Sequence, residues 1–459
     1  MDATRAIWQS NTVRAAIESG NRGAIVRSVR RARHLTLAQL AARCGYSISS
    51  LSRMERGRQP LTNIRVLRSL ADVLGIPPPV FGLADTPRRS VPPPRPAVRV
   101  GAILAPDEET DPMRRRALLA GLPSLAGSAV FGTPPSRVAS AGDSVGTLES
   151  ALLDPPIATG IPVAMLHLRH EVAAAHSVFQ HGRYIEVATR LPELVSTAMA
   201  TRAELTTSEG IGAASGQLAE IYTLASELMV KLGHDHLAWT TADRALQAAY
   251  SSGDILTQAA ARRALGIVLR RAGRAETAQR LVVDTAAALQ PELRHGPEYL
   301  SVYGSLLSTA AYTAAVDGDR NTARTLIGEA VDAADRLGVD GNHRFTAFGP
   351  TGVGLYRISI ARVLGDSGAA IEAARQINPA TIPLVERQAR YWSDVARSFY
   401  QWGKHEQCYR ALLAAERASP DEVRYRKPIQ QITVSLLQHP TAHKLPGLRA
   451  FAIRTGAPV

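Results

Sequence analysis

The 459-residue sequence predicts an all-α protein with two folded regions, a small basic one at the N-terminus and a long alanine-rich one from about residue 161. Apolar residues in both regions recur at the three- and four-residue spacing of amphipathic helices. Glycines recur where one helix should end and the next begin. A Pro-rich stretch separates the two regions, and 45% of all residues are apolar. We therefore expect more than one domain, with enough apolar surface for a sizeable core.

The first region carries small and apolar residues at the spacing that two tightly crossing helices require. Counted from Leu37, Ala41 is fifth, where a larger side chain would collide with the second helix. Gly45 is ninth, at the turn, where a left-handed φ suits glycine. Leu51 is fifteenth, between the helices. The remaining apolar wedge consists of Leu40, Cys44, Tyr46 and Met54.

The ends of these two helices are also marked in the sequence. Thr36 and Ser47 each precede a helical run as N-caps. Gly57, followed by Pro60, closes the second helix. The pattern predicts a helix-turn-helix.

The stretch L-T-L-A-Q-L-A-A-R-C-G-Y-S-I-S-S-L-S-R-M-E-R-G resembles the Cro and Xre type of phage-repressor-like DNA-binding domain. This resemblance implies an N-terminal domain over residues 1–83 whose second motif helix docks in the major groove of double-stranded DNA. Such small modules usually pair to read two half-sites ~34 Å apart, so we expect a homodimer.

Charge in this region supports the same function. Residues 1–83 hold thirteen Arg against four Asp or Glu, a net charge of +9 out of +13 for the whole chain. Phosphate contacts dominate non-specific DNA affinity, so a concentrated basic patch favours nucleic acid as the partner. The predicted phosphate contacts are Arg30, Arg56 and Arg58.

Periodicity selects the residues that can reach the bases. Because Leu51 and Met54 face inward, the outward face of the second motif helix holds Ile48, Ser49, Ser52 and Arg53. The resemblance implies that the first two helical residues and the sixth read bases. Arg53 can pair with guanine through two hydrogen bonds, and a thymine methyl suits Ile48.

Residues 84–160 are predicted to be a linker, because their first part is rich in Pro and Arg. Within it, Arg114–Phe131 resembles a twin-arginine export signal. Its internal position and Pro123 favour a buried or peripheral helix over membrane contact. Cys44 and Cys408 form no disulfide framework, and no signal peptide or long apolar run is present. We expect a cytoplasmic, nucleoid-associated protein without a membrane contact.

Residues 161–459 contain a degenerate helical repeat. Six glycines occupy predicted turns between paired helices: Gly182, Gly233, Gly273, Gly318, Gly368 and Gly403. The residue five positions after each glycine and the residue seven positions before it are small, which allows the helices of a pair to cross closely. This arrangement resembles the tetratricopeptide repeat, and it predicts a superhelix of helical hairpins.

Two segments do not belong to a generic repeat. They are F-T-A-F-G-P-T-G-V-G-L-Y-R-I at residues 345–358 and R-Q-A-R-Y-W-S-D-V-A-R at residues 387–397. With the repeats, they resemble the actinobacterial family of Xre-type regulators that carry C-terminal tetratricopeptide repeats. The resemblance implies a transcription regulator. The first segment is either a rigid connection between repeats or a ligand contact.

In this repeat family, residues thirteen, ten, six and three positions before each turn glycine face the inner groove. The groove positions we single out are His176, Arg263, Arg270, Tyr312, Arg362, Arg390, Arg397 and Tyr400. The acidic residues among the counted positions are Glu220 and Glu227. A positive groove suits the C-terminus of a peptide or an acidic segment of a protein partner. Two alternatives remain: these Arg pair with Glu on adjacent helices, or the repeats form a scaffold for self-association and partner proteins without a small effector.

The sequence shows no pattern typical of an active site. His167, His170 and Glu171 share a helical stretch without a third metal ligand at suitable spacing. Neither a phosphate-binding glycine loop nor a nucleophile elbow is present. We expect no enzymatic activity and no cofactor.

Overall fold

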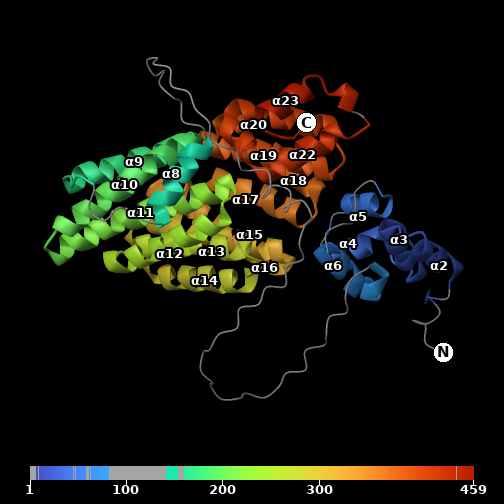
Figure 1. Cartoon of the computed structure of the whole chain (residues 1–459). Coiled ribbons are helices and arrows are strands. Elements are labelled where there is room, and N and C mark those ends of the chain that lie inside the picture. The colour runs from blue at the N-terminus through green and yellow to red at the C-terminus, as the bar shows by residue number, and fades with distance from the viewer. Residues whose placement is uncertain are drawn as a thin grey trace, which may run out of the picture. The chain divides into compact units, whose positions relative to one another are not determined.

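The computed structural model describes residues 7–8, 10–44, 46, 48–57, 61, 64–81, 141–153, 160–440 and 442–458. Across these residues the regular structure is helical, and no strand occurs among them (Figure 1). The predicted all-α fold class is confirmed. Residues 84–139 of the predicted linker lie outside the described part of the chain. The export-like segment Arg114–Phe131 is among them.

The N-terminal region is a group of short helices around one apolar core. Its most deeply buried side chains include Leu40, Leu51, Leu70 and Phe81. The core also contains every residue of the predicted apolar wedge. The helices are α2 (Asn11–Glu18), α3 (Arg22–Ala32), α4 (Leu37–Cys44), α5 (Ile48–Glu55), α6 (Ile64–Leu74) and the 3-10 helix η1 (Pro78–Phe81).

The second region is a series of helical hairpins, because each long helix packs against the next one along the chain. Its helices are α8 (Ala141–Leu153), α9 (Met165–Gln180), α10 (Tyr184–Glu204), α11 (Ser208–Leu232), α12 (Asp235–Ser252), α13 (Ile255–Arg271), α14 (Ala275–Leu289), α15 (Pro297–Asp317), α16 (Arg320–Leu337), α17 (Pro350–Val363), α18 (Ser367–Arg375), α19 (Val385–Gln401), α20 (His405–Ala418), α21 (Pro420–Arg424), α22 (Lys427–Leu437) and α23 (Leu448–Arg454). Short 3-10 helices are η2 (Gln290–His295), η3 (His343–Phe345), η4 (Pro379–Thr381) and η5 (Ala442–Lys444).

Five of the six predicted turn glycines adopt the expected left-handed conformation, with φ between +72° and +83°. The prediction for Gly368 is wrong. The left-handed residue is Gly365, with φ +83°, and the Asp366 carboxylate accepts a hydrogen bond from the Ala369 amide, which starts α18 at Ser367. Gly368 therefore lies inside α18, because the cap residue decides where this helix begins.

The hairpin series closes on itself. The helices α9, α11, α13, α15, α17 and α19 each contact the next, and α19 also contacts α9. At the closure, the Tyr184 amide donates to Asp421 Oδ2 at 2.8 Å, and Ser419 Oγ donates to the Gly182 carbonyl at 2.9 Å. These bonds join the first hairpin to the segment that follows the last one.

The repeat region also extends further toward the N-terminus than the predicted boundary at residue 161. Helix α8 lies within the predicted linker, yet Leu148 and Leu152 are fully buried in the same core as α9 to α12. Its apolar residues need that surface for burial, so α8 belongs to the repeat region.

The loop between α16 and α17 crosses to the first hairpins. The Phe345 ring stacks on His176 with 3.8 Å between centroids, and Arg344 Nη2 donates to Asp254 at 2.5 Å. Phe348 is buried against Gly304, where any Cβ would lie 1.9 Å from the ring. Arg344, Phe345 and Ala347 all have φ near +50° to +57°, a conformation that costs energy in non-glycine residues. For residues 345–348, these contacts favour a rigid connection between repeats, whereas Tyr356 in the same segment lines the cavity described below.

Candidate functional site

The predicted DNA-reading helix α5 is positioned by a capped partner helix. Thr36 Oγ1 accepts from the Gln39 amide at 3.1 Å, and Gln39 Oε1 accepts from the Thr36 amide at 2.8 Å. This reciprocal pair is a capping box, and it confirms Thr36 as the N-cap of α4. The predicted turn residues Gly45 and Ser47 lie outside the described residues.

Helix α5 packs inward through Leu51 and Met54, which are 0% and 2% exposed. A Cβ at Gly23 would lie 2.2 Å from the Met54 carbonyl oxygen, so only glycine allows α3 to approach α5 this closely. The end of α5 is marked by Gly57 with φ +70°, as predicted. The two inward contacts orient the opposite face of α5 away from the core.

Of the predicted base-reading residues, Ile48 is exposed, whereas Ser52 and Arg53 are half-buried. The Ile48 side chain is 51% exposed, so it is accessible to an apolar group of a partner. Arg53 Nη2 donates to Ser50 Oγ at 3.0 Å, and the exposed Arg56 is bonded to Ser52. The side chain of Ser49 and the whole of Arg58 lie outside the described residues.

Arg30 requires a correction. Its side chain is 8% exposed and makes a two-bond ion pair with Glu55, at 2.5 and 2.8 Å. A third bond runs from Arg30 Nη1 to the Leu35 carbonyl at 2.7 Å. The guanidinium is thus occupied inside the domain, tying α3 to α5. We describe Arg30 as a structural residue rather than as a phosphate contact.

Comparison with known families bears on this part of the chain. Residues 23–81 match the family described as "Helix-turn-helix domain". No curated protein and no solved structure matches the chain. The helix-turn-helix domain spans α3 to η1, and a domain of this kind indicates DNA binding. The match does not extend to the repeat region, for which the resemblance to tetratricopeptide repeats stays a prediction.

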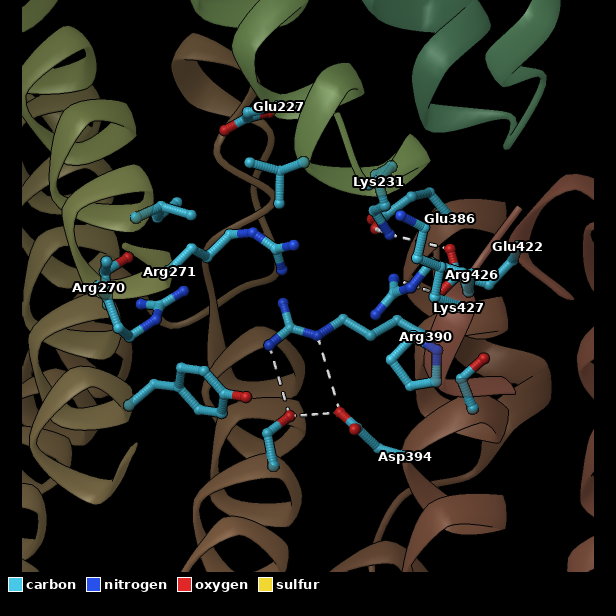
Figure 2. A pocket seen from close by; sticks show the side chains of 18 of the residues that line it. Glu227, Lys231, Arg270, Arg271, Glu386, Arg390, Asp394, Glu422, Arg426 and Lys427 are labelled. Atoms are coloured by element: carbon cyan, nitrogen blue, oxygen red, sulfur yellow. Dashed lines mark hydrogen bonds and ion pairs between the residues drawn. The ribbon is translucent and has the colours of Figure 1, made fainter. Parts of the chain in front are cut away.

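The repeat region encloses the second candidate site, a cavity of about 390 Å³. Its walls come from α9, α11, α13, α15, α17 and α19 together with α21 and α22 (Figure 2). Six of the eight predicted groove residues line it: Arg263, Arg270, Tyr312, Arg362, Arg390 and Arg397. The remaining two do not. His176 is covered by Phe345, and Tyr400 packs on His405 instead.

The cavity is strongly basic. Ten Lys and Arg side chains line it against five Asp and Glu. Asp394 is shared by three guanidinium groups, at 3.1 Å from Arg362, 3.7 Å from Arg397 and 3.9 Å from Arg390. Burial alone would raise the pKa of Asp394, but the three Arg, led by Arg362, lower it to about 2. The alternative that these Arg pair with neighbouring carboxylates is therefore correct for several of them.

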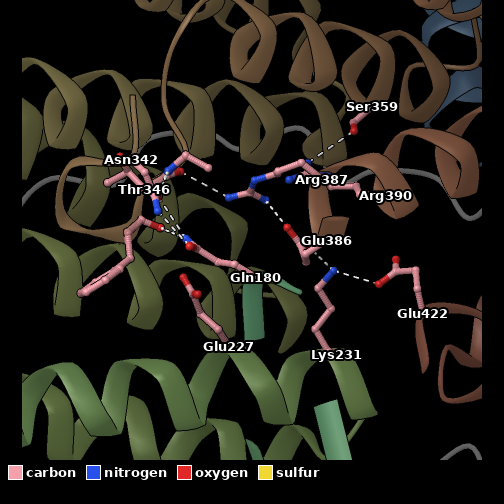
Figure 3. A network of polar contacts seen from close by, with 12 residues as sticks. Gln180, Glu227, Lys231, Asn342, Thr346, Ser359, Glu386, Arg387, Arg390 and Glu422 are labelled. Carbon is pink, nitrogen blue, oxygen red and sulfur yellow. Dashed lines mark hydrogen bonds and ion pairs between the residues drawn. The ribbon is translucent and has the colours of Figure 1, made fainter. Parts of the chain in front are cut away.

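A second ion-pair network lies at the closure of the hairpin series (Figure 3). Lys231 Nζ donates to Glu386 at 2.5 Å and to Glu422 at 3.0 Å. Glu422 also accepts from Tyr184 Oη at 2.8 Å and from Arg426 at 2.7 Å. Glu386 pairs with Arg387 at 3.3 Å. The network holds α10, α11, α19 and α21 together next to the cavity.

Sequence reasoning missed this network because none of its members stands at a counted groove position. The scarcity of lysine in the sequence could have indicated part of this network. The chain has only four Lys, and two of them, Lys231 and Lys427, line the cavity.

The positive charge of the cavity also lowers the pKa of two tyrosines, Tyr312 and Tyr356. Arg390 lies 4.5 Å from the Tyr356 ring, and Arg270 lies 4.8 Å from the Tyr312 ring. Burial alone would raise the pKa of Tyr356, but Arg390, with Arg263 and Arg387, lowers it to about 7. The pKa of Tyr312 is lowered in the same way, chiefly by Arg362 and Arg270. The cavity therefore favours negative charge, even on a phenol.

Among the described residues, no group of three or more His, Cys, Asp or Glu has the arrangement of a metal site. None of the described helices is long and apolar enough to span a membrane.

Proposed function

We propose that this protein is a sequence-specific transcriptional regulator that binds double-stranded DNA as a homodimer. In this proposal the repeat region senses a peptide or protein partner through an acidic group, and the chain has no enzymatic activity or cofactor. It acts in the cytoplasm, at the nucleoid. The observation that carries the proposal is the match of residues 23–81, which include α5, to the helix-turn-helix family.

The chemistry of the α5 side chains suits base reading. Ile48 offers an apolar contact for a thymine methyl, and Arg53 offers the paired donors that guanine accepts. Arg56 lies at the end of α5, where a side chain reaches the DNA backbone rather than the bases. The net charge of +9 over residues 1–83 supplies the sequence-independent part of the affinity.

The first test separates base reading from backbone binding. Arg53→Ala should cost ~1–3 kcal/mol on the preferred site and relax the preference at one base position, because one bidentate base contact is lost. Arg56→Ala, the matched control in the same helix, should weaken binding to all sequences alike and flatten the salt dependence. The preferred site is selected from random DNA with the full chain, and affinities are measured by fluorescence anisotropy. Equal losses on preferred and random DNA for Arg53→Ala would contradict the assignment.

Support for partner sensing comes from the cavity. Its cationic side chains outnumber its carboxylates by ten to five, so an acidic group would find more favourable charge here than in water. The cavity also lies next to the closure between α9 and α19, where a bound group contacts both ends of the hairpin series. A change there is transmitted to the DNA-binding domains only if the ligand binds two states of the protein unequally.

The double substitution Arg390→Ala with Arg397→Ala should abolish the cellular response while the purified full chain still binds its selected DNA site. The matched control is Arg375→Ala with Arg410→Ala, because both side chains are more than 70% exposed and neither lines the cavity. Promoter activity is compared across growth conditions by reporter assay. Normal regulation by the cavity variant under all conditions would favour the scaffold function for the repeats.

A further inference from the structure

The cavity carries more positive charge than its own carboxylates balance. Its lining has ten Lys or Arg and five Asp or Glu, an excess of five positive charges. Uncompensated charges in a partly enclosed site are costly because they are removed from water. A single carboxylate would neutralise only one of the five. The charge balance favours a ligand group with at least two negative charges.

Arg270 shows where such a group would sit. It makes no ion pair with any described carboxylate: its guanidinium donates to Thr313 Oγ1 at 3.1 Å and lies over the Tyr312 ring. Burial is the main reason that its pKa is lowered. The Arg270 side chain is therefore a charged donor without an anionic partner among the described residues.

Ser393 supplies an independent observation. Its side chain lines the cavity from α19, it is 3% exposed, and its Oγ has no hydrogen-bond partner among the described residues. Buried hydroxyl groups are nearly always hydrogen-bonded, so this one marks a place for a ligand atom.

The directions of the Arg side chains distinguish between anions. Arg270 comes from α13, whereas Arg390 comes from α19 on the opposite side of the cavity (Figure 2). Arg362, from α17, adds a third wall. A carboxylate is planar and is matched by one guanidinium fork. A phosphoryl group presents three oxygens in different directions, which suits donors that converge from several walls.

We propose that the cavity binds a phosphoryl group, with Arg270, Arg362, Arg390 and Ser393 as its donors. This inference rests on the proposed function in taking the cavity as the ligand site, and it specifies the acidic group. The volume of about 390 Å³ is near the lower end of ligand pockets, so little more than the phosphoryl group and its immediate carrier fits. That carrier is either a small phosphorylated molecule or one phosphorylated residue of a partner peptide.

The test is calorimetric titration of the full chain with inorganic phosphate, O-phosphoserine, a phosphoserine pentapeptide, acetate and succinate at constant ionic strength. Phosphate and phosphoserine should bind more tightly than either carboxylate. Arg270→Met should weaken their binding about tenfold or more, since a charged hydrogen bond is lost. Ser393→Ala should weaken it about two- to tenfold. Arg274→Met is the matched control, because Arg274 follows Arg270 by four residues but lies outside the cavity lining.

Thermal unfolding without ligand confirms that each variant is folded. The proposal is overturned if succinate binds as tightly as phosphate, or if Arg270→Met and Arg274→Met behave alike. Tighter binding of the pentapeptide than of free phosphoserine assigns the phosphoryl group to a partner peptide, and equal binding assigns it to a small molecule. Selective DNA binding without phosphate binding removes this inference alone, whereas phosphate binding without selective DNA binding removes the proposed function alone.

Discussion

Glu422→Ala is expected to destabilise the repeat region by about 3–5 kcal/mol, the range found when one member of a buried ion pair is removed. The Glu422 side chain is 0% exposed and binds Lys231, Arg426 and the Tyr184 hydroxyl. Without it, the partly buried Lys231 and Arg426 each lose one carboxylate partner, and the closure between the two ends of the hairpin series is weakened. Urea unfolding followed by tryptophan fluorescence measures the effect, since three of the four Trp lie in this region.

The control is Glu406→Ala, which removes an exposed pair with Arg410 on α20. Exposed pairs of this kind contribute about 0–1 kcal/mol. If both substitutions shift the midpoint by the same small amount, Glu422 does not hold the closure. An unchanged signal for Glu422→Ala would also contradict the packing of α10 against α21.

Arg30→Ala is the second substitution with a large expected effect. It leaves Glu55, which is 6% exposed, without its partner, and we expect a loss of about 3–5 kcal/mol in the helix-turn-helix domain. DNA binding should then fail on every sequence because the domain unfolds. Circular dichroism at increasing temperature, with DNA binding measured on the same samples, checks this.

A double variant separates structure from phosphate contact. Arg30→Met with Glu55→Leu replaces the pair by apolar side chains of similar length, which is often neutral or stabilising. If Arg30 has a purely structural role, this variant should fold and bind DNA. If the double variant folds but binds every DNA sequence weakly, Arg30 is a phosphate contact as the sequence predicted.

The sequence contained most of the local information needed for the site on α5. Helical periodicity placed Leu51 and Met54 inside and Ile48 outside, and the structure confirms all three. The sequence does not indicate that Arg30 is buried, because a surface Arg and a buried Arg have the same local pattern. The structure shows the Arg30 Nε atom 2.5 Å from Glu55 Oε1. The prediction of a turn at Gly368 is wrong for a related reason. Gly365 and Gly368 are both possible turn residues, and the cap formed by Asp366 determines that the turn is at Gly365.

By itself, the sequence determined the all-α class, the basic N-terminal domain, the helix ends at five turn glycines and six of the cavity residues, because these depend on spacing along one or two helices. Only the tertiary structure decided that the hairpin series closes. Closure joins Lys231 to Glu386 and Glu422, residues 155 and 191 positions away. Such contacts depend on the rotation that accumulates from hairpin to hairpin, which no local pattern specifies. The same accumulated rotation turns an open groove into a partly enclosed cavity with an excess of positive charge.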